Sequence, residues 1–124
     1  MHIQFAELPV FDQDRAKRFY VEAFACTTVA DVPMSADGWR WIELKFNGAD
    51  TALHFTRRKD ETTSVDPVMV LIDADVAASV AKLKAKGVEI VTEPGPAPYD
   101  PGRIAAEFRD SEGNRMVLST AGAA

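Results

Sequence analysis

Apolar and polar residues follow each other along the chain in a pattern that occurs twice. The first half opens with alternating apolar residues over 6–10 and turns acidic at Asp12. The second half opens with an apolar run over 68–72 and turns acidic at Asp73. Short apolar runs closed by an acidic residue are typical of a strand that leads into a helix. Each half is therefore predicted to begin with a strand and a capped helix.

After each acidic residue, apolar positions recur at intervals of three and four, as they do on the buried stripe of a helix. An aspartate can cap each helix: Asp12 or Asp14 the first, and Asp73 or Asp75 the second. Gly87 is suited to end the second helix. The predicted stripes are Ala16, Phe19, Tyr20, Ala23 and Phe24 in the first helix and Val76, Val80 and Leu83 in the second.

Three further strand-like segments follow each helix, separated by turn-forming residues. The order β-α-β-β-β thus occurs twice, which indicates duplication of a half-domain. Each half alone buries too little, so we expect an α+β fold of two βαβββ modules that share a cavity. The predicted strands are 27–32, 39–46, 51–56, 88–92, 104–108 and 115–119, with a proline-rich loop at 94–102 and a hairpin turn at 110–114.

A chain of 124 residues with 47% hydrophobic content suits one domain with a real core. We expect this domain to span residues 1–120, with module one at 1–57, a linker at 58–66 and module two at 67–120. The Ala-Gly-rich residues 121–124 are expected to be a frayed tail.

Charge and cysteine content narrow the class of protein. A net charge of −5 argues against a nucleic-acid surface, which needs clustered Lys and Arg. No apolar stretch is long enough for a membrane span or a signal peptide, so no membrane partner is expected. The one cysteine, Cys26, cannot form an internal disulfide, which favours the cytoplasm. We interpret Cys26 as a buried small residue rather than a catalytic thiol.

Three motifs occur in a specific order: a strand ending in Asp12 before a helix with Phe19-Tyr20, a helix end at 83–88, and a hairpin at 109–114. Together they resemble the vicinal oxygen chelate superfamily of glyoxalases, bleomycin-resistance proteins and extradiol dioxygenases. Ser111 stands where that family usually has proline. The resemblance implies the paired βαβββ fold and a homodimer, but not one reaction, because the superfamily hosts several.

The resemblance also implies where metal ligands would lie. Metal-dependent members have up to four metal-ligating residues. The corresponding positions in this sequence are Phe5, His54, a position near residues 66–68 (with Asp66 as the donor), and Val117. Phe5 and Val117 have no donor atom, and two remaining donors are too few for Mg, Mn, Fe or Ni sites of this kind. We therefore expect that the inherited metal site is lost and that no cofactor is bound.

Strand alternation predicts which side chains face the cavity. If His54 faces inward, Leu53 and Phe55 pack toward the helix. The same reasoning turns Glu43 inward. The candidate ligand-binding residues are Phe5, Glu7, Trp39, Trp41, His54, Arg103, Glu107 and Val117.

Each candidate has a functional and a structural interpretation. Trp39 and Trp41 form either a stacking platform for a planar or cationic ligand, or part of the core or of a dimer interface. Glu7 and His54 form either an acid–base or ligand-orienting pair, or a structural hydrogen-bonded pair.

Arg103 either clamps an anionic group or forms a salt bridge with Glu107, which is the interpretation we favour.

Three hypotheses follow for the function. The first is metal-free binding or sequestration of a small organic molecule, aromatic or cationic, as in bleomycin-resistance proteins. The second is a metal-dependent enzyme of glyoxalase or dioxygenase type with a relocated ligand set such as Glu7, His54 and Glu107. The third is a metal-free enzyme that uses Glu7 or His54 as general base. The missing ligands favour the first over the second, and the sequence does not separate the first from the third.

Overall fold

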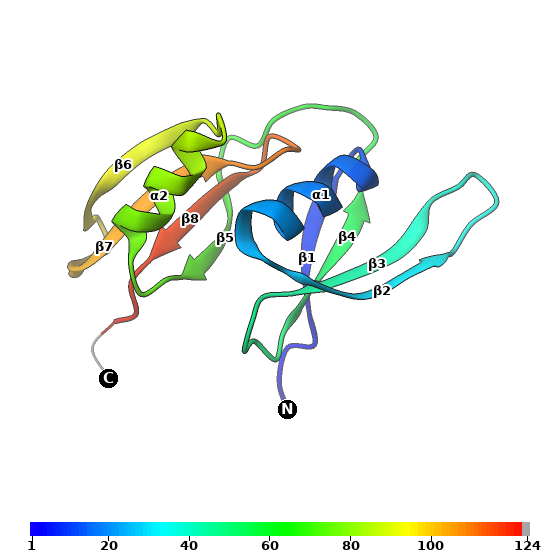
Figure 1. Cartoon of the computed structure of the whole chain (residues 1–124), viewed down its shortest axis with the longest axis horizontal. Helices are drawn as coiled ribbons and strands as arrows, with labels where there is room; N and C mark the ends of the chain where they lie inside the picture. Colours follow the sequence, from blue (N-terminus) through cyan, green and yellow to red (C-terminus); the bar gives the residue numbers. More distant parts are fainter. Residues whose placement is uncertain (123–124) are drawn as a thin grey trace. The chain divides into compact units, whose positions relative to one another are not determined.

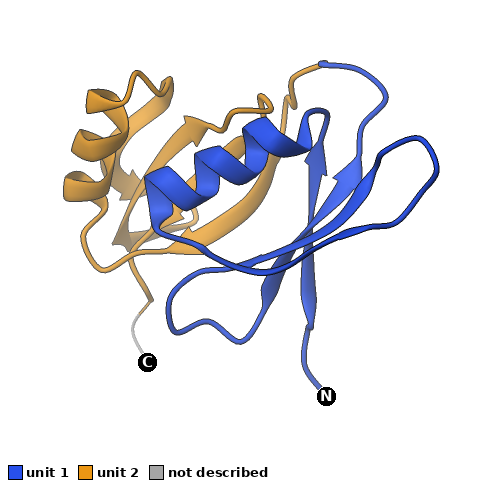
Figure 2. Cartoon of the chain, turned by 45° about the vertical axis from the view of Figure 1, so that its right-hand side comes forward, with its two compact units in different colours: residues 1–61 blue, residues 62–124 orange. Residues whose placement is uncertain are grey.

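The computed structural model describes residues 1–122, which form two compact units, one of residues 1–61 and one beginning at Thr62 (Figure 1 and Figure 2). Each unit has one helix and one four-stranded mixed sheet, which confirms the predicted α+β fold of two βαβββ modules. The predicted tail, 121–124, lies partly outside the described residues. The first unit contains β1 (Phe5–Val10), α1 (Gln13–Phe24), β2 (Thr27–Pro33), β3 (Arg40–Lys45) and β4 (Ala52–Arg57). The second contains β5 (Pro67–Ile72), α2 (Val76–Ala85), β6 (Ile90–Ala97), β7 (Asp100–Arg109) and β8 (Arg115–Ser119).

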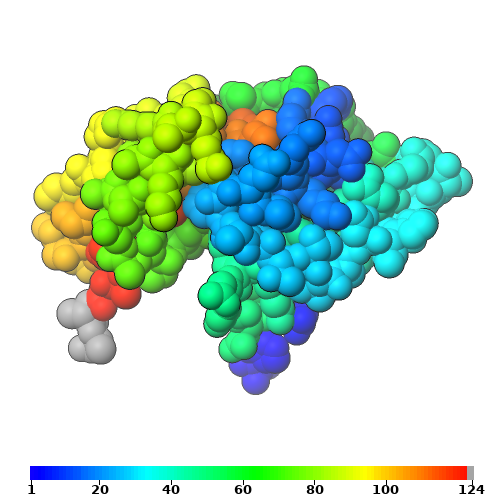
Figure 3. All heavy atoms as spheres, viewed as in Figure 1, coloured from blue at the N-terminus to red at the C-terminus, as the bar shows by residue number. Residues whose placement is uncertain are grey.

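The two sheets have the same topology. Their strand orders are β1-β4-β3-β2 and β5-β8-β7-β6. In each, the first strand pairs in parallel with the last, and the other neighbours are antiparallel. Each helix covers one face of its own sheet (Figure 1), and little of β8 is visible in the space-filling view (Figure 3).

In the first unit, the helix-covered face carries the apolar core. Leu53 and Phe55 are 3% and 1% exposed, whereas His54 between them belongs to the opposite face. The predicted strand register is therefore confirmed, because a shift of one residue would exchange the two faces. The buried residues of this core are Leu8, Val10, Ala16, Tyr20, Ile42, Leu44, Leu53 and Phe55.

Phe19 and Phe24, which were predicted to lie on the buried stripe of the first helix, are only half-buried, and so is Phe46 after β3. Their rings contact each other or Tyr20 near the end of α1. They form the margin of the core, which a single helix cannot cover completely.

In the second unit, the stripe of α2 packs on the strands in the same way. Val76, Val80 and Leu83 are each at most 3% exposed. On the sheet, Ala106, Phe108, Met116 and Leu118 are buried as well.

The helix ends follow the predicted chemistry. The carboxylate of Asp12 accepts a hydrogen bond from the Arg15 amide, and Asp75 does the same for Ala78. These bonds satisfy amides that have no partner within the helix. Gly87 has a φ of +79° after α2, where a residue with a Cβ would be strained.

The predicted loop at 94–102 is wrong. Most of it is strand: β6 continues to Ala97 and β7 already begins at Asp100. Proline has no amide to donate and is usually confined to edge strands, and β6 is an edge strand of its sheet. Register shifts in the pairing of β6 with β7, such as the one between Thr92 and Gly95, accommodate the prolines of β6.

Candidate functional site

The open face of the first sheet gathers four of the predicted site residues. Strand register places Phe5 and Glu7 on β1 beside His54 on β4, with Trp41 on the neighbouring β3. The Trp41 and His54 rings lie 3.9 Å apart between centroids, at an interplanar angle of 34°. Phe5 approaches both, at 5.8 Å from Trp41 and 5.7 Å from His54. We call Phe5, Trp41 and His54 the aromatic cluster.

Two carboxylates hold the polar atoms of this cluster. Nδ1 of His54 lies 2.7 Å from Oε2 of Glu7, and Nε1 of Trp41 donates to Oε1 of Glu43 over 2.7 Å. A carboxylate only accepts hydrogen bonds, so Nδ1 of His54 must carry the proton in this contact. The two bonds fix the orientation of both rings.

The other ring nitrogen of His54 has no such partner. Nε2 is buried and makes no hydrogen bond to any described residue. A buried unpaired polar atom costs about 1–3 kcal/mol, so it calls for an explanation.

Trp39 lies apart from the aromatic cluster. It precedes β3, and its ring is covered by the guanidinium of Arg57 at 5.3 Å from the centroid. Among the described residues, no ring contact joins Trp39 to Trp41. Trp39 instead lines a shallow pocket of about 280 Å³ with Asp37 and Arg40. The structure therefore does not bring the two tryptophans together as one platform.

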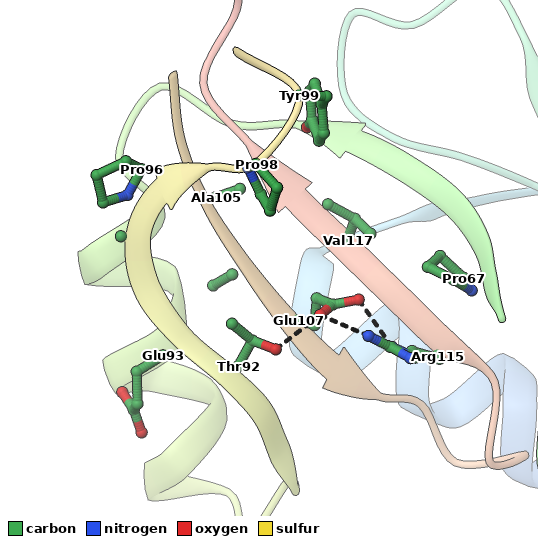
Figure 4. A pocket seen from close by; sticks show the side chains of 12 residues that line it. Pro67, Thr92, Glu93, Pro96, Pro98, Tyr99, Ala105, Glu107, Arg115 and Val117 are labelled. Atoms are coloured by element: carbon green, nitrogen blue, oxygen red, sulfur yellow. Dashed lines mark hydrogen bonds and ion pairs between the residues drawn. The ribbon is translucent and has the colours of Figure 1, made fainter. Parts of the chain in front are cut away.

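The second unit contains a pocket of about 350 Å³ on the open face of its own sheet (Figure 4). Strands β6, β7 and β8 contribute most of its lining. Much of the wall is rigid and apolar, and four polar side chains interrupt it. The lining residues are Pro67, Thr92, Glu93, Gly95, Pro96, Pro98, Tyr99, Ala105, Ala106, Glu107, Arg115 and Val117.

An ion pair forms the polar part of this pocket (Figure 4). Arg115 donates from Nε to one oxygen of Glu107 over 2.8 Å and from a terminal nitrogen to the other over 2.9 Å. Thr92 also donates its hydroxyl to Glu107, over 2.6 Å. The Arg115 hydrogen bonds, followed by that from Thr92, hold the pKa of Glu107 below its ordinary value, so the carboxylate stays ionised at neutral pH.

The predicted salt bridge between Arg103 and Glu107 is wrong. Arg103 pairs with Asp100 over 3.2 Å, while Glu107 pairs with Arg115. Residues four apart on one strand are about 13 Å apart, too far for a direct bond. Arg115 is a diagonal neighbour on the adjacent strand, because Glu107 is registered with Val117.

Several pocket residues were missed in the sequence, notably Arg115, Thr92 and Tyr99. Arg115 could have been found from strand alternation, which puts it on the same face as Val117. Thr92 lies in the predicted strand 88–92, but register shifts on both sides of it set its pairing with Glu107, and the sequence does not show them. Tyr99 was missed because it lies in the segment that reads as a loop.

Burial raises the pKa of the Cys26 thiol to about 12, which agrees with its interpretation as a buried small residue.

Comparison with known proteins decides the family. The model of the Glyoxalase/Bleomycin resistance protein/Dioxygenase superfamily matches residues 2–118. The chain belongs to this superfamily. TnmS3, an antibiotic binding protein from Streptomyces sp. CB03234, is 32% identical, with a TM-score of 0.79 over 98% of this chain and 97% of that one. A glyoxalase/bleomycin resistance protein from the same Streptomyces is 30% identical, with a TM-score of 0.75 over 96% of this chain and 100% of that one.

A curated relative, the uncharacterized protein YetH of Bacillus subtilis (strain 168), is 28% identical over 111 residues, or 88% of this chain and 89% of YetH. Among the described residues, neither helix has the length and apolar character needed to cross a membrane.

The residues present do not fit the metal site that the superfamily implies. At the first ligand position, the Phe5 ring packs against Trp41 and His54. At the last ligand position, Val117 on β8 is an apolar residue that is only 7% exposed. Across residues 1–122, no three His, Cys, Asp or Glu side chains gather closely enough to hold an ion. The two apolar positions remove half of the usual donor set.

Proposed function

We propose that this superfamily member binds and sequesters a small organic molecule, planar and aromatic or cationic, with no resident metal. The observation that carries the proposal is Val117, which stands at a family metal-ligand position and lines the pocket of the second unit. An apolar side chain there offers packing to an organic ligand and no donor to an ion.

The size and walls of the pocket support this proposal. A volume of about 350 Å³ is within the range of small-molecule sites. Three prolines and Tyr99 supply flat apolar surfaces that lose little conformational entropy on binding. Glu107 is ionised and already accepts hydrogen bonds from Arg115 and Thr92, so its oxygens keep capacity for about one further donor group of the ligand.

The comparisons support the same class of ligand. TnmS3 is an antibiotic binding protein that matches nearly the whole chain. We propose that the aromatic cluster and Glu7 form a ligand-contacting surface on the open face of the first unit, and that Glu107 and Val117 form one on the open face of the second. Trp39 and Arg103, the other two predicted site residues, belong neither to the aromatic cluster nor to the lining of the pocket in the second unit.

A matched pair of variants tests the proposed pocket. Equilibrium dialysis in EDTA would use metal-free bleomycin, ethidium and 2-naphthol as probes. Ala105→Phe fills the pocket and should weaken binding of the best probe at least about tenfold. Ala81→Phe, on the exposed side of α2, is the control and should bind like wild type. Equal affinities in both variants, or no binding of any probe to wild type, would contradict the proposal.

A second candidate function is a metal-free enzyme with His54 as general base. The 2.7 Å contact from Glu7 to Nδ1 and the unpaired Nε2 favour it. The alternative of a relocated metal site with Glu7, His54 and Glu107 has less support, because Arg115 and Thr92 already engage Glu107.

We also propose that the chain is a cytoplasmic homodimer. The apolar side chains of Val70 and Ile72 on β5 are 52% and 60% exposed, which suits a covered surface. Size-exclusion chromatography with light scattering would give twice the chain mass, and a monomer mass at micromolar concentration would contradict this.

A further inference from the structure

Nε2 of His54 is in an unusual state for a buried polar atom. Its ring is fixed by Glu7 on one side, and the side chain as a whole is only 12% exposed. A histidine with a purely structural role normally satisfies both ring nitrogens. Here the second nitrogen points away from Glu7 and finds no partner among the described residues.

The contact with Glu7 determines what Nε2 can do. Because Nδ1 donates to the carboxylate, the neutral ring must present a lone pair at Nε2. Nε2 is therefore an acceptor, and its natural partner is an O–H or N–H group. The neighbouring Trp41 and Phe5 rings make the surroundings suitable for a flat apolar body that carries this donor.

The contacts within the aromatic cluster indicate which ring can move to admit a ligand. Trp41 is held by its hydrogen bond to Glu43, whereas the Phe5 ring is placed by ring contacts alone. Phe5 begins β1 directly after residues 1–4, which are exposed and outside any strand or helix. Of these two rings, Phe5 is the one that can rotate without breaking a side-chain hydrogen bond.

We propose that His54 is a specificity-determining residue that accepts a hydrogen bond from an aromatic alcohol, with Glu7 as the positioning residue. This inference rests on the proposed function and names the chemical class of its ligand. A site built to bond a hydroxyl rejects the analogue that lacks it, because a buried polar atom is then left unpaired.

Two probes that differ at one oxygen test the proposal by isothermal titration calorimetry. Wild type should bind 2-naphthol about tenfold more tightly than 2-methoxynaphthalene, which cannot donate. His54→Phe keeps a ring and removes the nitrogen, so the ratio should fall to about one. Thr56→Val, on the same face two residues along β4, is the control and should keep the wild-type ratio.

A nitrogen-detected NMR spectrum of the histidine ring reads the tautomer without any ligand. Free wild type should show Nε2 without a proton, and Glu7→Leu should lose this preference. A protonated Nε2 in the neutral ring would overturn the proposal, as would a preference for 2-naphthol that survives in His54→Phe or is absent from wild type. If neither naphthalene probe binds but bleomycin or ethidium does, this inference fails and the proposed function stands.

Discussion

The two units share one topology and differ in what their open faces carry. In the first, Glu7, His54 and Glu43 lie side by side on three neighbouring strands. In the second, the corresponding strands place Val70, Val117 and Glu107 side by side. The helix-covered faces of both units carry the buried apolar core. The two units thus share the pattern of the core and differ in the chemistry of the open face.

The consequences differ between the two faces. In the first unit, rings fill the space and carboxylates fix them, so one buried nitrogen is left without a partner. In the second, the small side chains of Ala105 and Val117 leave a pocket beside the Glu107–Arg115 pair. We infer that the open face of the second unit offers a pocket for a ligand, and that the open face of the first offers a specific hydrogen-bond acceptor.

The largest expected effect comes from the core side of this comparison. Phe55 is 1% exposed, and Phe55→Ala should lower the free energy of unfolding by about 3–5 kcal/mol. Phe5→Ala, on the open face of the same sheet, should cost less than half as much because Phe5 is only partly buried. Urea denaturation would measure both. Equal losses would contradict the division into a core face and an open face.

A smaller loss of stability is expected from variants in the β-hairpin turns, and it should differ between the turn that joins β7 to β8 and the one that joins β3 to β4. In the second unit, the buried Asp110 carboxylate accepts hydrogen bonds from the Glu112 and Asn114 amides and from the Asn114 side chain. Asp110→Ala should therefore lower the free energy of unfolding by about 2–3 kcal/mol. The first unit's turn is exposed at Asn47, and Asn47→Ala should cost about 0.5 kcal/mol. Thermal unfolding of both variants would check this, and a larger loss for Asn47→Ala would reverse it.

The smallest expected effect is on the way the free energy of unfolding depends on pH at the Glu107 carboxyl. The pKa of Glu107 is lowered from its ordinary value of 4.5, so the folded protein favours the ionised form. Glu107 therefore stabilises the fold fully at a pH above 4.5, the pKa of the carboxyl in the unfolded chain. This stabilisation is lost as the pH falls through the lower pKa that the carboxyl has in the folded protein. Glu107→Gln should remove this contribution, about 1 kcal/mol, and make stability less dependent on pH below about 5.

Urea midpoints measured from pH 7 to pH 3 would test this. Thr92→Val removes the weaker of the two side-chain hydrogen-bond contributions that lower the pKa of Glu107. The dependence of its urea midpoint on pH should lie between those of wild type and Glu107→Gln. An unchanged slope in Glu107→Gln would show that Arg115 does not stabilise the carboxylate.

The sequence predicted the fold because the period of apolar residues reports which face is buried. It placed Leu53 and Phe55 in the core and His54 on the other face, and strand pairing then brought Glu7 to His54. It could not show that the proline-rich segment before Tyr99 is an edge strand, since tertiary pairing with β7 overrides local propensity. It also mispaired Arg103, because the partner of Glu107 depends on the cross-strand register rather than on position along one strand.

We propose that the open faces bind an organic molecule and no resident metal ion. Native mass spectrometry of the protein purified from the cells that produce it tests this proposal, because one spectrum resolves organic and metal adducts. We expect an organic adduct and no stoichiometric divalent metal, with the adduct reduced in Ala105→Phe. About one metal ion per chain, lost in His54→Ala, would contradict it and favour an enzyme of glyoxalase type.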